Sequence, residues 1–369
     1  MNRDLLQKRL SIGHNGSPQF KKILDKYHRY IHDVYVAPAG WVMQSTRPNS
    51  YVNNEDYNNI IQSHIRYCKE NEYSIRFSLL LNSQCWNGEF RSSTLLQRIF
   101  NYIDLMNNCF DEFVVSDEFI AKELKQRYPE CKISLSVISA VNDYETCAEM
   151  LALFPDFETI CVGHKMTYQY KEMERIKKCF GKKVKLLINQ GCYYNCPDYT
   201  LHSTALAHSH KNVPPMENGK HLYCDYINSL ENELAWKNLT HQALAPNQLQ
   251  FYDNVVDIFK LSTRIEKDVE RIDQIISAYI HGDMKFFAKK LFMGGGRSVS
   301  YRVAGIFSLV EYPEDYIIIR NKCNNRCSTC TYCKTLWEKA EKRYDSMLEE
   351  EKPSPEDLFF RNNSPGYPV

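Results

Sequence analysis

Short apolar runs alternate with helical patterns along most of the chain, and this alternation limits the possible folds more than any other feature. Each run is rich in Val, Ile, Leu or Phe and is bounded by polar or turn-forming residues, as expected for a strand covered on both faces. Eight such runs are found, at residues 33–38, 73–81, 112–115, 132–138, 158–162, 184–189, 242–246 and 256–262. We therefore predict an α/β fold, a TIM-type (β/α)8 barrel over residues 30–283, with a doubly wound open sheet as the alternative.

The ends of the chain differ from this middle part. Residues 1–29 are assigned to an N-terminal extension. Residues 284–351 form a small cysteine-rich C-terminal appendage with a β-like segment, Asp315–Arg320, and a charged helix, Lys334–Glu351. Residues 352–369 are rich in Pro and Asn and are expected to be a flexible tail.

Charge and hydropathy exclude several classes of protein. The 46 basic and 45 acidic residues nearly balance, so no basic field indicates nucleic acid as an obligatory partner. The N-terminus lacks the apolar core of a secretory signal, and no run approaches 18 apolar residues. We expect a cytoplasmic protein with no membrane segment.

Fourteen cysteines are many for such a chain. In a reducing compartment, spaced cysteines are more often metal ligands or catalytic thiols than disulfides. Seven of them fall into two sets, which we name the rim set (Cys192, Cys196 and Cys224) and the tail set (Cys323, Cys327, Cys330 and Cys333).

The rim set follows the apolar run at residues 184–189, where a barrel enzyme builds its site from the loops after its strands. Cys192 and Cys196 can place two thiolates on one metal, and Cys224 can fold back as a third ligand. Nearby tyrosines would shield the site, which favours a [4Fe–4S] cluster over an exchangeable ion. The alternative is that these residues are unliganded thiols.

The tail set places four thiolates within eleven residues, a spacing that holds zinc or an iron–sulfur cluster. Disulfides are the alternative. Its first three cysteines match the radical S-adenosylmethionine signature, but that motif normally precedes a barrel, and only 36 residues follow Cys333. We therefore interpret it as a cluster site in the appendage.

Three further residues are candidates for the chemistry of the site. Lys260 and Arg264 flank the end of the last apolar run, and a lysine inside such a run is costly unless its ammonium reaches the barrel mouth. Lys260 is therefore expected to face an anionic group, or else to close the barrel with a salt bridge. His202 is the third candidate, because it lies on the long segment after the sixth run, where it can reach the barrel rim. The sequence contains no Ser-His-Asp elbow and no HExxH motif, so the ordinary hydrolase signatures are missing.

Several motifs resemble the collagenase-like peptidases of family U32 and their relatives in ubiquinone and RNA hydroxylation. They are SVISAV, the strand ending in N-x-G-C-x3-C-P followed by a histidine, VDIFKLSTR, and a helix ending in AYIHG. The resemblance covers about residues 30–282. It implies a TIM-type barrel and a four-cysteine [4Fe–4S] cluster. Cys192 and Cys196, with Cys224 as a third residue, correspond to its ligands, and Cys85 or a tail cysteine is the fourth.

These observations favour an iron–sulfur protein with one or two clusters, engaged in redox-linked, hydroxylation-type modification of an RNA, a peptide or an aromatic metabolite. Zinc is the alternative at the tail set. One rival interpretation is a metal-dependent peptidase or other hydrolase using rim histidines. The other is a non-enzymatic electron-transfer or maturation partner of another redox protein.

Overall fold

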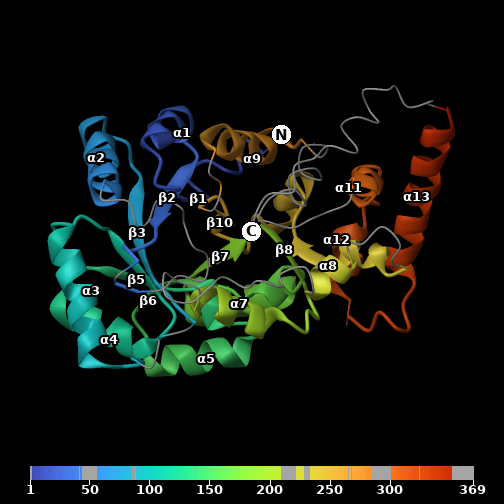
Figure 1. The fold of residues 1–369 in the computed structure, drawn as a ribbon. Coiled ribbons are helices and arrows are strands. Elements are labelled where there is room, and N and C mark those ends of the chain that lie inside the picture. The colour runs from blue at the N-terminus through green and yellow to red at the C-terminus, as the bar shows by residue number, and fades with distance from the viewer. Residues whose placement is uncertain are drawn as a thin grey trace.

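Eight parallel strands close into a barrel in the computed structural model (Figure 1). The structure describes residues 2–40, 42–43, 56–84, 86, 89–208, 222–227, 233–264, 266, 268–283, 301–323 and 325–350. The order around the barrel is β1-β10-β7-β6-β5-β4-β3-β2, and β1 pairs with both β10 and β2. The predicted TIM-type (β/α)8 barrel is confirmed, and the open sheet is wrong. The barrel strands are β1 (Leu10–Gly13), β2 (Ile31–Val36), β3 (Arg76–Leu81), β4 (Glu112–Val115), β5 (Lys132–Leu135), β6 (Phe157–Cys161), β7 (Lys183–Leu187) and β10 (Ile258–Leu261).

Two strand predictions need correction. Leu10–Gly13, which we placed in the N-terminal extension, is the first barrel strand, and all four of its residues are buried. The barrel therefore begins before residue 30. The run at residues 242–246 is not a barrel strand, because β9 (His241–Ala243) pairs antiparallel with β8 (Asn189–Tyr193) in a separate two-stranded sheet.

The helices around the barrel begin and end where local chemistry favours it. Asp117 accepts backbone N–H bonds from Phe119 and Ile120 at the start of α4, and Ser92 does the same for Leu95 at the start of α3. Gly181 ends α6 with φ +62°. The described α-helices up to the last barrel helix are α1 (Lys21–Tyr27), α2 (Tyr57–Glu70), α3 (Ser93–Leu105), α4 (Glu118–Arg127), α5 (Tyr144–Leu153), α6 (Tyr170–Phe180), α7 (Tyr199–His208), α8 (Tyr223–Ile227) and α9 (Val269–His281).

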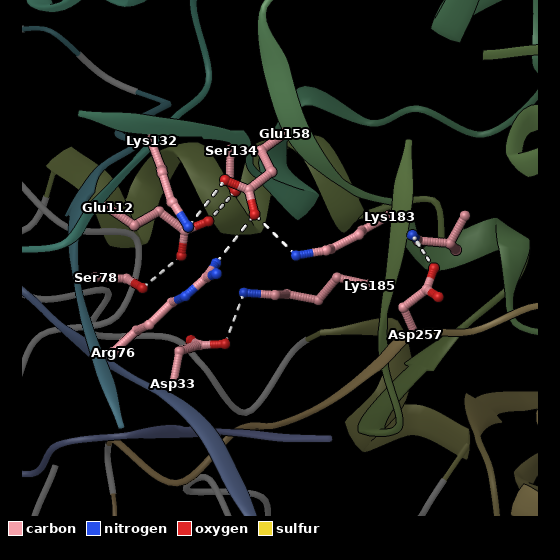
Figure 2. A network of polar contacts seen from close by, with 11 residues as sticks. Asp33, Arg76, Ser78, Glu112, Lys132, Ser134, Glu158, Lys183, Lys185 and Asp257 are labelled. Carbon is pink, nitrogen blue, oxygen red and sulfur yellow. Dashed lines mark hydrogen bonds and ion pairs between the residues drawn. The ribbon is translucent and has the colours of Figure 1, made fainter. Parts of the chain in front are cut away.

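The barrel interior contains a layer of polar side chains (Figure 2). Lys185 of β7 donates to Asp33 of β2 at 3.0 Å, and Ser11 of β1 donates to the same carboxylate at 2.7 Å. Glu112 of β4 accepts from the hydroxyls of Ser78 and Ser134 on its two neighbouring strands. Lys185 and Asp33 thus form an ion pair across the barrel, whereas Glu112 is held by hydroxyl groups of the adjacent strands.

The C-terminal helices are α11 (Tyr301–Ser308), α12 (Tyr316–Asn321) and α13 (Tyr332–Glu350), and they lie beside α8 at one end of the molecule (Figure 1). Phe307 and Trp337 belong to the same buried apolar cluster as the barrel. The predicted charged helix near residues 334–351 is thus present as α13. The prediction of a β-like segment at 315–320 is wrong, because Tyr316, Ile317 and Arg320 are buried at helical spacing on α12.

Among the described residues, no helix combines the length and the apolar character needed to cross a bilayer. The triple glycine at 294–296 and the tail at 352–369 lie outside the described residues.

Candidate functional site

A pocket of about 120 Å³ opens at the carboxyl ends of the barrel strands. It is the place where barrel enzymes assemble their sites from the loops after the strands. The structure brings the three predicted site residues together here: Lys260 comes from β10, Arg264 from the turn after it, and His202 from α7. The other lining residues are Tyr35, Leu80, Asn82, Gln84, Val137, Ile138, Leu187, Gln190, Tyr199, Ser203 and Ser262.

Both cations in the pocket wall are buried, with Lys260 7% and Arg264 6% exposed. The Lys260 ammonium lies 4.3 Å from the centre of the Tyr35 ring. Burial lowers the pKa of Lys260, as do the charges of Lys185 and Arg264, while Cys161 and Asp33 act in the opposite direction. None of the described residues that line the pocket is an aspartate or a glutamate. The described wall of the pocket thus contains two cations and no carboxylate.

Close packing holds Arg264 and Tyr35 in position. The Tyr35 hydroxyl donates to the backbone oxygen of Leu261 at 2.7 Å. A Cβ at Gly13 would lie 2.7 Å from Cε2 of Tyr35 and 2.8 Å from the backbone nitrogen of Arg264. Only a glycine at the end of β1 allows this approach, and a barrel strand that we missed in the sequence thus positions a predicted site residue.

Amide side chains form another part of the wall. Asn82 donates to Ser136 at 2.6 Å. By contrast, Oε1 of Gln84 and Nε2 of Gln190 are buried without a hydrogen-bond partner. We did not identify these two glutamines from the sequence. The signal in the sequence was their position, one to three residues after an apolar run.

His164 lies behind this wall. Its ring stacks on Tyr199 at 3.7 Å between centroids, and neither ring nitrogen has a hydrogen-bond partner. Burial, followed by the charge of Lys165, lowers its pKa to about 4. His164 is therefore neutral at pH 7 and supports Tyr199 without lining the pocket.

The rim set comes together beside this pocket. Cys192 lies on β8, Cys196 on the turn that follows, and Cys224 on α8. Cys196 packs against Tyr193 and Cys224. The pKa of Cys196 is raised to about 11, chiefly by burial, and the neighbouring Cys192 and Cys224 act in the same direction. His210 and Cys85 lie outside the described residues.

Cys323, Cys327 and Cys330 of the tail set lie between α12 and α13, and Cys333 lies in the first turn of α13. Arg320 donates to Sγ of Cys333 at 3.7 Å, and Sγ of Cys323 accepts from the backbone N–H of Asn325 at 3.3 Å. Burial raises the pKa of Cys327, with Cys323 as the next cause and Cys330 as a smaller one. Asn195 of the rim turn donates to the backbone oxygen of Asn325 at 3.4 Å, so the segments that carry the two cysteine sets are in contact.

The described thiols gather, but they do not stand in a metal-holding arrangement. Among the described residues, no group of three or more His, Cys, Asp or Glu side chains is placed to hold a metal ion. Thiolates are the ligands that an iron–sulfur cluster or zinc prefers.

The fold and the pocket define a TIM-type barrel protein with a cationic mouth. No protein-family model matches the chain. The chain is 24% identical over 351 residues to "Uncharacterized protease MJ1657" of Methanocaldococcus jannaschii. The aligned region covers 90% of this chain and 95% of the relative. The solved structure of the U32 peptidase Mk0906 superposes with a TM-score of 0.51 at 13% identity, covering 69% of this chain and 92% of that one.

The sequence relative is named a protease, and the structural neighbour is a peptidase of U32, the family that the sequence motifs resemble. At 13% identity, the structural likeness bears on the fold alone.

Proposed function

We propose that this chain is a U32-like barrel enzyme that holds an anionic group of its substrate between Lys260 and Arg264. The observation that carries this proposal is a pocket with two buried cations and no carboxylate among its described lining residues. Burial of the Lys260 ammonium is costly and lowers its pKa, and an anion entering the pocket would offset that cost.

The reaction class that the relatives favour is hydrolysis of a peptide bond, since the sequence relative is named a protease and the structural neighbour a peptidase. In this reaction the oxygen of water adds to the carbonyl carbon, the C–N bond breaks, and the leaving amine takes a proton. His202 lines the pocket and is the candidate for holding and moving that proton. Lys260 and Arg264 would position the substrate through its anionic group.

The experiment is hydrolysis of a peptide mixture, followed by mass spectrometry, for the wild type and for Lys260→Met, Arg264→Met and His202→Gln. Loss of a charge-assisted contact to an anion costs roughly 1.5–3 kcal/mol, so each cation variant should raise KM about 10- to 100-fold for anionic peptides. His202→Gln should lower kcat with little change in KM. The matched control is Lys178→Met, at an exposed lysine of α6 that pairs with Glu174 one turn away. Unchanged KM in both cation variants would overturn the proposal.

A second candidate is the redox-linked, iron–sulfur function, alone or with a partner redox protein. It is supported by the gathering of seven cysteines in two sets joined by the Asn195–Asn325 contact. RNA, a peptide or an aromatic metabolite is the proposed substrate.

This candidate is tested by anaerobic purification, metal analysis and a visible spectrum. About four irons that disappear in Cys196→Ser would support a cluster at the rim set, and about eight would support two clusters. Cys179→Ser, an exposed thiol outside both sets, is the control and should keep its metal. A colourless protein with zinc lost only in Cys327→Ser would support a structural tail site and the hydrolase.

A further inference from the structure

Two glutamine side chains in the pocket wall each bury one carboxamide atom that has no hydrogen-bond partner. Oε1 of Gln84 is an acceptor on the loop after β3, and Nε2 of Gln190 is a donor on β8. Gln190 is only 4% exposed. Buried polar groups in native proteins are almost always paired, because an unpaired one pays its full desolvation cost. One free acceptor and one free donor in the same pocket therefore point to a ligand that supplies their partners.

A secondary amide supplies both partners at once, since its N–H can donate to Gln84 and its carbonyl oxygen can accept from Gln190. The same pocket holds Lys260 and Arg264, which suit a carboxylate. Its remaining wall includes the aliphatic side chains of Leu80, Val137, Ile138 and Leu187.

We infer that the pocket binds an acylated amino acid, that is, the carboxyl-terminal residue of a peptide. The carboxylate lies at the two cations, the amide that precedes it at the two glutamines, and an aliphatic side chain at the apolar wall. This inference rests on the proposed anion site and adds to it the chemical group that accompanies the anion.

A nucleotide offers a similar set of groups, with a phosphate and a base that carries N–H and C=O. Proteins that read a base, however, usually stack it on an aromatic ring. One face of Tyr35 is covered by the ammonium of Lys260 at 4.3 Å, and one face of Tyr199 by the ring of His164 at 3.7 Å. The described contacts thus favour the peptide terminus.

The test is binding of small probes to the full chain, followed by ligand-detected NMR titration. The probes are N-acetyl-L-alanine, O-acetyl-L-lactate, N-acetyl-L-alanine methylamide and uridine 5′-monophosphate. The first two differ only in the amide N–H, which is an ester oxygen in the lactate. The variants are Gln84→Leu and Gln190→Leu, with the exposed Gln97→Leu of α3 as control and circular dichroism to check folding.

We expect N-acetyl-L-alanine to bind about 10-fold more tightly than O-acetyl-L-lactate, because the ester leaves Gln84 unpaired. Gln84→Leu should abolish that difference, and Gln190→Leu should weaken both acids. The methylamide, which lacks the carboxylate, should bind weakest of the three.

Equal binding of the two acids, unaffected by Gln84→Leu, would overturn this inference while leaving the anion site intact. Tighter binding of uridine 5′-monophosphate that depends on the glutamines would also overturn it, in favour of a nucleotide. If no anionic probe bound, both this inference and the proposed anion site would fail.

Discussion

The ion pair between Lys185 and Asp33 lies at the centre of the barrel, where removing one partner should be costly. The two groups are 3.0 Å apart, with 5% and 0% of their side chains exposed (Figure 2). Burial alone raises the pKa of Asp33, but Lys185, together with His32 and the Ser11 hydroxyl, outweighs it and leaves the pKa below its usual value. The carboxylate therefore depends on the ammonium to remain charged.

Lys185→Met keeps the length of the side chain and removes this charge. Breaking a buried pair from one side costs about 3–5 kcal/mol of the free energy of unfolding. In the variant, burial becomes the dominant effect, so the folded-state pKa of Asp33 rises above its unfolded value of about 3.9. A raised acid pKa favours folding only when the group is protonated, so the loss should be largest at pH 7 and smaller near pH 5.

Lys183→Met is the matched control, on the same strand and the same face. Its ammonium lies 2.8 Å from Glu158, but the two side chains are 41% and 27% exposed. Such a partly solvated pair contributes about 0–1 kcal/mol. The double variant Asp33→Asn, Lys185→Met removes both charges and should recover most of the loss. Urea unfolding at pH 7 and pH 5 measures all four proteins. The reasoning is refuted if Lys185→Met costs no more than Lys183→Met, or if its loss is the same at both pH values.

Two other predictions concern the barrel mouth. Gly13→Ala should force β1 away from the turn that carries Arg264, because the new Cβ would lie 2.8 Å from a backbone nitrogen. We expect a loss of about 1–3 kcal/mol in unfolding free energy and weaker anion binding, and a variant that bound anions normally would contradict this account. His164 has a folded-state pKa of about 4, below its unfolded value of about 6.5, so it contributes stability above pH 6.5 that is lost as the pH falls toward 4. His164→Phe, which can keep the stack on Tyr199, should remove about 1.4 kcal/mol per pH unit of that dependence in urea unfolding between pH 6 and pH 4.5, and an unchanged pH slope would disprove it.

The sequence predicted the barrel because alternation of strands and helices is a local pattern that repeats. It missed β1 because Leu10–Gly13 is only four residues long and lies between Arg9 and His14, so no local pattern distinguishes it from a loop. Its pairing partner β10 lies about 250 residues away, and closure of the barrel determines the pairing. The prediction of a barrel strand at 242–246 was wrong for the opposite reason. Its local pattern is strand-like, but the strand pairs with β8, outside the barrel.

Local propensity also misled us at α12. Three successive isoleucines, at 317–319, favour a strand, yet Ile318 is 47% exposed while Tyr316 and Arg320 are buried four residues apart. Arg320 reaches the backbone oxygen of Leu239 at 3.4 Å and the ring of Tyr168 at 4.2 Å. These contacts with distant segments favour the helix, and no window of sequence contains them.

At the pocket, charge was easier to predict than hydrogen bonding. Lys260 was identifiable because burying an ammonium in an apolar strand is costly, so its presence there indicates a function or an ion pair. A glutamine after a strand, by contrast, is no different in sequence from an ordinary loop residue. That Gln190 lacks a partner follows only from the arrangement of all its neighbours.

The two layers of charge inside the barrel explain why the mouth should respond to pH. Lys185 lies one layer below Lys260, paired with Ile258 in the β7–β10 register, and its charge is matched by Asp33. Lys260 faces the mouth, and burial together with Lys185 and Arg264 lowers its pKa. A bound anion would favour its charged form, so binding takes up a proton wherever free Lys260 is partly neutral.

Affinity for an anionic probe should therefore decline as the pH rises through the lowered pKa of Lys260, below the usual 10.5 of a lysine. Titrating N-acetyl-L-alanine at a series of pH values from 7 to 10 measures this decline. Lys260→Met should bind more weakly at pH 7 and lose the dependence. If the variant kept the same decline, the titrating group would be elsewhere, and the buried ammonium would be only a structural part of the wall.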